Sequence, residues 1–274
     1  MKQIAIVSLH QNLSDYINML TFLRCSFRII RCTDSLSPLC DGLLLPGDRD
    51  CSPELYGQKN NGSRNVCLEE DLLQLCALDR YRHAGRPVLG IDKGMHLINL
   101  AFGGSLRQQI GRYPHDAVRL KCLRATDACP PPDFAFPSCH CETAPFRVLV
   151  FDRYHSTTLR EGSMLEALYG ASLFVNSRHH QAIDQIGHGL ETVQSAFDGC
   201  PEAILHRTLP IIGVQWHPER LLPGSQDQSH GLYDAVQMPK RTGFLHCALA
   251  QKTTDCLPAL ADGSLLFRLF LALA

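Results

Sequence analysis

A short apolar run that ends in a glycine-bracketed turn constrains the fold of this chain more than any other stretch. Residues 87–91, PVLGI, are typical of a buried strand. Gly90 and Gly94 bracket Asp92 on a sharp turn, and apolar residues then recur with a helical period up to Gly104. Such a strand–turn–helix is a nucleophile elbow, which presents one side chain at the carboxyl edge of a parallel sheet, near backbone N–H groups that stabilise an oxyanion. The presented residue here is Asp92.

Apolar runs of strand length alternate with helical patterns along most of the 274 residues. This alternation predicts an α/β fold with a mainly parallel central sheet. With 45% hydrophobic residues the chain can bury one full core, so we expect a single domain over residues 1–274. The predicted strands are residues 3–8, 26–31, 41–45, 88–91, 146–151, 172–175, 190–196, 202–206 and 211–216. The predicted helices are 16–23, 69–82 (with Leu72, Leu73, Cys76 and Ala77 on one apolar face), 95–101, 164–168 and 265–274.

Two stretches, residues 107–145 and 223–261, lack a clear period and are expected to be irregular excursions from the sheet. The first holds a local group among the thirteen cysteines, for which a metal site is one alternative. Because the spacing lacks paired CxxC knuckles, we favour reduced loop cysteines and expect neither a metal nor a cofactor. This group is Cys122, Cys129, Cys139 and Cys141, with His140 between the last two.

The charge and the hydropathy of the chain give no indication of a nucleic-acid partner or of membrane association. The formal net charge of −1 gives no reason to expect nucleic acid or an anionic membrane surface. The apolar amino-terminal run is broken by His10, Gln11 and Asn12, unlike a signal peptide. No stretch approaches the roughly 20 apolar residues of a membrane span. Because the cysteines are scattered and suit a reducing compartment, we expect a cytoplasmic protein.

Three other polar motifs also follow predicted strands, and each occurs once. Residues 46–50 form a Pro-Gly turn at a strand end, where α/β sheets place ligand chemistry. A segment Asn-Ser-Arg-His-His-Gln occupies residues 176–181, and His-Pro-Glu occupies residues 217–219. A single histidine after a strand is more often a structural residue than a catalyst. The order of the motifs along the chain is the stronger signal for one site.

In this order the motifs resemble the class I glutamine amidotransferase-like superfamily, and most closely its γ-glutamyl-γ-aminobutyrate hydrolase family. The resemblance implies a three-layer, flavodoxin-like α/β sandwich and a Cys–His–Glu triad that hydrolyses γ-glutamyl amides through a thioester. It also implies a small γ-glutamyl or glutamine-like ligand. The matching stretches are LLLPGDRDCSPELYG (43–57), EDLLQLCAL (70–78), PVLGIDKGMHLINLAFGGSL (87–106), VNSRHHQAI (175–183), DGCPEAI (198–204) and GVQWHPER (213–220).

By position, His217 resembles the base of the family's triad and Glu219 the carboxylate that orients it. This agrees with the chemistry, because an imidazole near the elbow exchanges a proton and a carboxylate fixes its tautomer. Gly47 and the backbone N–H of Lys93 resemble the oxyanion hole. The wall beside the γ-glutamyl group is expected from Asn176, Ser177, His179, His180 and Gln181, which are otherwise simply a polar strand end.

Three positions depart from the family pattern. The family's Gly-Ile-Cys-Arg-Gly is Gly-Ile-Asp-Lys-Gly here, so the nucleophile position is Asp92. The family's Pro-Gly-Gly is Pro-Gly-Asp, which puts the charge of Asp48 beside the expected oxyanion site. The usual glutamine four residues after the nucleophile is His96, which we include in the ligand-binding wall.

A carboxylate is a poor nucleophile toward an amide carbonyl. The attack forms a tetrahedral intermediate that expels the carboxylate, whose conjugate acid has a pKa of about 4, much faster than an amine. The reaction therefore returns to substrate, and we expect an impaired or inactive hydrolase homologue: a retired site or one with an inactivating substitution.

Other roles stay open at this point. Asp92 is a candidate general base toward water or a nucleophile toward a substrate with a better leaving group; it is also a candidate ion-pair partner of His217. Asp48, Asp92, His217 and Glu219 are an alternative set of ligands for a divalent cation. A non-enzymatic regulator, with the two excursions as contact surfaces, is a third class, and a homodimer is possible.

Overall fold

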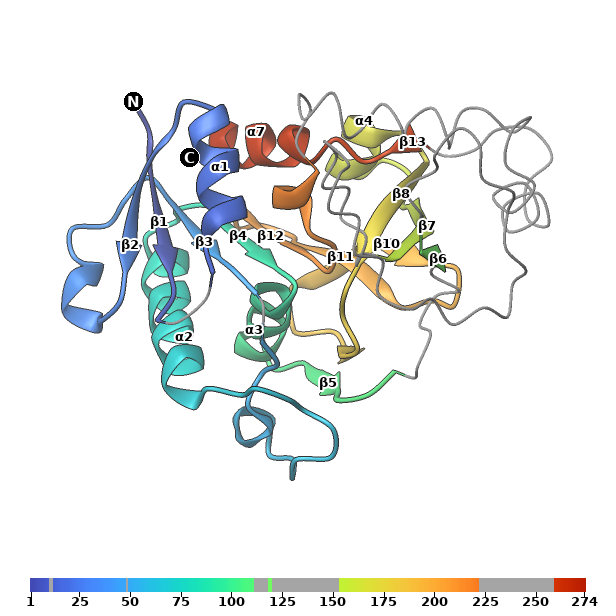
Figure 1. The fold of residues 1–274 in the computed structure, drawn as a ribbon, viewed down its shortest axis with the longest axis horizontal. Helices are drawn as coiled ribbons and strands as arrows, with labels where there is room; N and C mark the ends of the chain where they lie inside the picture. The colour runs from blue at the N-terminus through green and yellow to red at the C-terminus, as the bar shows by residue number, and fades with distance from the viewer. Residues whose placement is uncertain (10–11, 48, 111–117, 120–152, 222–258) are drawn as a thin grey trace, which may run out of the picture.

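A large β-sheet runs through the chain, with helices on both of its faces (Figure 1). The computed structural model describes residues 1–9, 12–47, 49–110, 118–119, 153–221 and 259–274. The strand order is β13-β8-β7-β10-β11-β12-β4-β3-β1-β2, and β6 also pairs with β7. The strands are β1 (Gln3–Val7), β2 (Ser26–Ile30), β3 (Gly42–Leu45), β4 (Val88–Ile91), β6 (Val118–Arg119), β7 (Arg153–Leu159), β8 (Ser172–Ser177), β10 (Leu190–Ala196), β11 (Pro201–His206), β12 (Ile211–Val214) and β13 (Ala259–Leu260).

The sheet has a parallel half and a largely antiparallel half. Strands β2, β1, β3, β4 and β12 are joined by parallel pairings, so their carboxyl ends meet at one edge. Strands β12, β11, β10, β7 and β8 are joined by antiparallel pairings, and β13 adds to β8 in parallel. The α/β fold is confirmed, and the predicted elbow lies in the parallel half.

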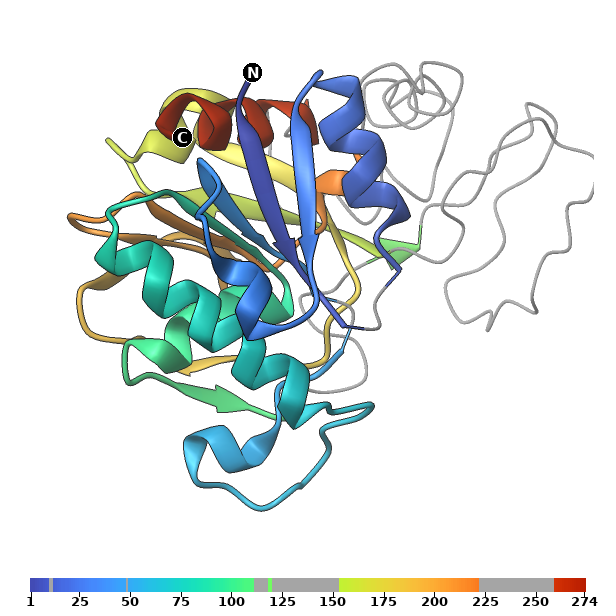
Figure 2. The same ribbon diagram turned by 90° about the vertical axis from the view of Figure 1, so that its left-hand side faces the viewer.

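Helices cover both faces because the strand residues alternate between two cores (Figure 2). In β1, Ile4 and Ile6 point into one core, while Ala5 and Val7 point into the other. The first core is closed by α1 (Ser14–Phe22), α4 (Met164–Tyr169) and α7 (Gly263–Leu273). The second is closed by α2 (Leu68–His83) and α3 (Lys93–Ala101). The result is the expected three-layer sandwich.

Helix α2 corrects one detail of the sequence prediction. Leu72 is 51% exposed, and the buried face instead includes three polar residues. Gln74 donates to the carbonyl oxygens of Val7 and Pro46, so this face binds strand ends instead of packing only against apolar side chains. The polar residues of the buried face are Glu70, Asp71 and Gln74.

Several predictions fall outside the described residues. These are the strand at 146–151, the cysteine group of residues 122–141, and most of the two excursions. Within the described parts, β7 and a small antiparallel pair were not predicted; the pair is β5 (Ser105–Arg107) with β9 (Ala182–Gln185). Strand β12 ends two residues earlier than predicted, at Val214. Across the described residues, no helix is both long and apolar enough to cross a membrane.

Candidate functional site

The elbow forms at the carboxyl end of β4. Asp92 has φ 49° and ψ −109°, a conformation that is strained for a non-glycine residue, and α3 begins directly after it. A Cβ at Gly90 would lie 2.6 Å from the carbonyl carbon of Gly94, and a Cβ at Gly94 would lie 2.1 Å from the carbonyl oxygen of Leu45. The tight approach of strand and helix therefore requires both glycines.

The two carboxylate oxygens of Asp92 have different partners. Oδ1 accepts a hydrogen bond from Nε2 of Gln215 at 2.7 Å. Oε1 of Gln215 lies 2.7 Å from Nε2 of His96, which must donate because the amide oxygen only accepts. Burial lowers the pKa of the His96 imidazole, and the charge of Asp92 opposes this only in part. Oδ2 of Asp92 lies 4.0 Å from Nε2 of His217.

His217 lies between two carboxylates. Its Nδ1 is 2.8 Å from Oε1 of Glu219, and both side chains are buried. Burial lowers the pKa of His217, but the charge and hydrogen bond of Glu219 and the charge of Asp92 outweigh it and raise the pKa to about 9. At neutral pH the imidazole is therefore protonated.

Asn176 fixes the backbone of His217 instead of lining the pocket. Its Oδ1 accepts from the backbone N–H of His217 at 2.9 Å, and its Nδ2 donates to the carbonyl oxygen of His217 at 3.0 Å. Ser177 is buried at the end of β8. These two predicted wall residues thus belong to the scaffold of the site.

The candidate oxyanion groups lie against each other. A Cβ at Gly47 would be 2.4 Å from the backbone nitrogen of Lys93, so only glycine fits at this contact. The N–H of Gly47 donates to the hydroxyl of Tyr16 at 3.2 Å. Asp48, whose charge was expected here, lies outside the described residues.

The side chain of Lys93 is buried beneath the elbow in an ion-pair network. Its Nζ lies 3.0 Å from Asp71 and 4.0 Å from Glu70. Asp71 also accepts from the backbone N–H of Ser52, and Glu70 from that of Leu9. The network joins α2, the elbow and two loops. The sequence predicted a role only for the backbone N–H of Lys93 and did not reveal the ion pairs of its side chain. The acidic residues at the start of α2 were the sequence feature that could have indicated these ion pairs.

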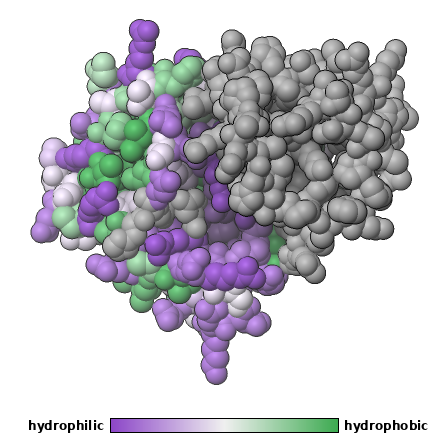
Figure 3. All heavy atoms as spheres, viewed as in Figure 1, coloured by the Kyte–Doolittle hydropathy of each residue, from purple (hydrophilic) through white to green (hydrophobic). Residues whose placement is uncertain are grey.

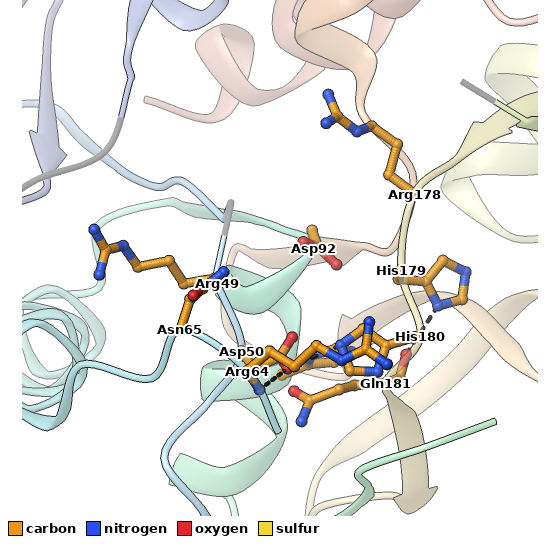
Figure 4. Close-up of a pocket in the computed structure, with 10 residues that line it drawn as sticks. Arg49, Asp50, Arg64, Asn65, Asp92, Arg178, His179, His180 and Gln181 are labelled. Carbon is orange, nitrogen blue, oxygen red and sulfur yellow. Dashed lines mark hydrogen bonds and ion pairs between the residues drawn. The ribbon is translucent and has the colours of Figure 1, made fainter. Parts of the chain in front are cut away.

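A polar cavity of ≈ 200 Å³ opens beside Asp92 (Figure 4). In the view of Figure 3, hydrophilic side chains lie beside a hollow near the middle of the molecule. Two predicted wall residues are held by loop contacts: His180 Nε2 lies 2.9 Å from Asp50, and Gln181 Nε2 donates to Ser63 Oγ at 2.7 Å. The described residues that line the cavity are Arg49, Asp50, Arg64, Asn65, Asp92, His96, Arg178, His179, His180 and Gln181.

A buried His–Glu–His cluster lies behind this wall. Oε1 of Glu202 is 3.5 Å from Nε2 of His179 and 3.3 Å from Nε2 of His155. Nδ1 of His179 lies 2.8 Å from the carbonyl oxygen of Gln181 and must donate to it. The Nε2 side of the same ring faces the carboxylate of Glu202. Burial lowers the pKa of His179, but the hydrogen bond and charge of Glu202 raise it overall.

A thiol that lies next to the elbow is buried and not exposed to the cavity. Cys51 is fully buried, and its Sγ lies 3.9 Å from the carbonyl oxygen of Lys93. Burial and the charge of Asp71 raise the pKa of the Cys51 thiol well above its usual value. The described part of the cavity lining contains no cysteine. Within the same described residues, no three His, Cys, Asp or Glu side chains are grouped to hold a metal ion.

Solved structures with a similar fold identify the fold class. A glutamine amidotransferase from Thermotoga maritima aligns with a TM-score of 0.55 and 11% identity, over 98% of each chain. A glutamine amidotransferase from Methylobacillus flagellatus aligns with a TM-score of 0.52 and 13% identity, over 99% of this chain and 94% of that one. The fold is that of the class I glutamine amidotransferases.

Sequence comparison identifies the family. The Peptidase C26 model matches residues 31–219. Protein NtpR of Enterococcus hirae is 28% identical over 71% of this chain and 72% of its own length. A putative glutamine amidotransferase-like protein of Rickettsia prowazekii is 31% identical over 69% and 73%. The γ-glutamyl-γ-aminobutyrate hydrolase PuuD of Escherichia coli is 28% identical over 68% and 66%. The chain belongs to the peptidase C26 family.

Proposed function

We propose that this chain binds a γ-glutamyl or glutamine-like small molecule and does not hydrolyse its amide bond, because Asp92 occupies the position of the family's nucleophilic cysteine. The observation that carries the proposal is the placement of Asp92 on a strained elbow, next to His217 and the polar cavity. The relatives that hydrolyse γ-glutamyl-γ-aminobutyrate give the class of ligand.

The charges around Asp92 support ligand binding. An anionic Asp92 next to a protonated His217 has the same signs of charge as a thiolate–imidazolium pair, so a ligand meets a similar field. The carboxylate, however, does not retain an acyl group against reversal to the amide.

The same charges argue against Asp92 as a general base in amide hydrolysis. Its Oδ1 already accepts a hydrogen bond from Gln215, and its Oδ2 faces a protonated imidazole. Oδ1 is therefore already occupied, and Oδ2 lies next to a group that is itself a proton donor.

Replacing Asp92 by cysteine tests this function. We expect the unmodified protein to bind γ-glutamyl-γ-aminobutyrate or glutamine in calorimetry without turnover. The Asp92→Cys variant is expected to release the amine, because a thiolate beside His217 forms a thioester. The matched control is Asp92→Cys combined with His217→Gln, which we expect to bind without turnover.

Two outcomes contradict the proposal. Rapid amide hydrolysis by the unmodified protein means that Asp92 is catalytically competent. If neither the unmodified protein nor the Asp92→Cys variant binds a γ-glutamyl compound, the family's pocket has been lost.

A further inference from the structure

The two carboxylate oxygens of Asp92 have different neighbours. Oδ1 is held by the amide of Gln215, which is itself held by His96. Oδ2 faces His217 at a distance too long for a hydrogen bond, and the side chain of Asp92 stays 15% exposed beside the cavity. In Figure 4 the Asp92 side chain lies between the two walls of this cavity.

The outcome of nucleophilic attack by a carboxylate depends on the carbon it attacks. At an acyl carbon the tetrahedral intermediate expels the carboxylate again. At a saturated carbon the attack displaces the leaving group in one step, and the product is a stable ester. We propose that Asp92 is a nucleophile toward saturated carbon, and that the chain hydrolyses small anionic alkyl compounds with a good leaving group through an ester on Asp92.

The cavity indicates the class of substrate. At ≈ 200 Å³ it fits only a small molecule, and none of its described lining side chains is apolar. Arg49, Arg64 and Arg178 supply positive charge at its edges. Of these, Arg49 and Arg64 have no ion-pair partner among the described residues. A short carboxylic acid with a halide or similar leaving group matches this size and charge.

In the first step a lone pair of Oδ2 forms a bond to the saturated carbon. The bond between that carbon and the leaving group breaks, and the leaving group departs as an anion with the electron pair. Asp92 becomes a neutral ester. His217 then faces only one carboxylate, Glu219, so its pKa falls and it releases its proton to solvent more readily.

In the second step neutral His217 takes a proton from water, and the hydroxide adds to Cγ of Asp92. The negative charge develops on Oδ1, where the N–H of Gln215 already donates. The acyl C–O bond breaks, and the alcohol leaves with the proton of His217. The new carboxylic acid of Asp92 returns a proton to His217, which restores the resting ion pair. The sum is alkyl halide plus water giving alcohol, halide and one proton.

Chloroacetate is a suitable probe, with glycolate as the product. A single turnover in water enriched in oxygen-18 is expected to place one label in the Asp92 carboxylate, located by peptide mass spectrometry. In the His217→Gln variant, which lacks the base, we expect Asp92 to keep one carboxymethyl group as a trapped ester. Peptide mapping separates this ester from any carboxymethylated cysteine.

Asp92→Asn is the matched control, because it keeps the size of the side chain and removes its charge. We expect it to form no glycolate above the buffer background, and imidazole NMR is expected to show a lower pKa for His217 in this variant. The labelling experiment uses the unmodified protein, so its result can be interpreted even if a variant does not fold.

An unlabelled Asp92 after incubation with chloroacetate overturns the proposal, as does equal glycolate formation by Asp92→Asn. Neither result tests the proposed binding of γ-glutamyl compounds, which is measured separately by calorimetry. Conversely, loss of γ-glutamyl binding leaves the oxygen-18 result valid.

Discussion

His217 connects the ionisation of the site to the stability of the fold. Its pKa is raised from 6.5 to about 9 in the folded state, while the unfolded chain retains the lower value. A group with a raised folded pKa stabilises the protein fully below the unfolded pKa and loses that contribution as the pH passes the folded pKa. The burial of an imidazolium between two carboxylates therefore favours the folded state at neutral pH but not in alkali.

We predict that the free energy of unfolding falls by about 3 kcal/mol between about pH 6.5 and about pH 9, at about 1.4 kcal/mol per pKa unit. Urea unfolding at several pH values measures this. The control is Glu219→Gln, which removes the carboxylate nearest the imidazole and is expected to flatten most of the slope. A slope that is the same in both proteins rules out His217 as its source.

The elbow is supported by a buried ion pair between helices α3 and α2. Lys93 and Asp71 are almost completely buried, so removing the lysine leaves an uncompensated carboxylate. We predict that Lys93→Met lowers the free energy of unfolding by roughly 3–5 kcal/mol, measured in urea. Arg82→Met, which removes a partly exposed pair with Asp79 on the same helix α2, is expected to cost about 1 kcal/mol.

Strand β11 sets the charge of the pocket wall through Glu202. The groups that face His179 are Glu202, Asp92, His96 and the carbonyl oxygen of Gln181. In the Glu202→Gln variant, burial still lowers the pKa of His179, but the charge of Glu202 no longer opposes this effect. We therefore predict that the pKa of His179 falls. Imidazole NMR measures the change. Glu191→Gln on β10 removes a partly exposed carboxylate paired with Arg160 and is expected to leave the pKa of His179 unchanged. A fall of similar size in that variant contradicts the local explanation.

The elbow was predictable because its requirements are local. Gly90, Gly94 and the spacing of apolar residues lie within one short stretch, and a tight strand-to-helix turn needs small residues there. The partners of the site residues were not predictable in this way. Gln215 reaches Asp92 because β12 pairs with β4, and Glu202 reaches His179 through the sheet. Sequence spacing does not specify such neighbours.

Helices from opposite ends of the chain cover one face of the sheet. Helix α7 packs Phe270 against Gly42 of β3, where a Cβ would lie 2.9 Å from the ring. Nζ of Lys2 donates to the carbonyl oxygen of Leu271, so the two ends of the described chain also lie together (Figure 1). The antiparallel half of the sheet was not predicted, because the direction of each strand pairing is set by contacts between strands and not by the pattern within one strand.

Phe270 is completely buried, and its removal leaves a cavity next to β3. We predict that Phe270→Ala lowers the free energy of unfolding by roughly 3–5 kcal/mol and lowers the melting temperature accordingly. Leu273→Ala, on an exposed position of the same helix, is expected to stay within about 0.5 kcal/mol of the unmodified protein. Equal effects of the two substitutions mean that α7 is not packed as described.

The carboxylate on the elbow also changes how this molecule responds to oxidants. A thiolate next to an imidazolium is the form of cysteine that peroxide converts to sulfenic acid and then, irreversibly, to sulfinic and sulfonic acids. Asp92 has no sulfur, and the neighbouring Cys51 is fully buried with a raised pKa. We therefore expect the described lining of the pocket, which contains no cysteine, to keep its pattern of charges under oxidising conditions that would destroy a thiol at the same position.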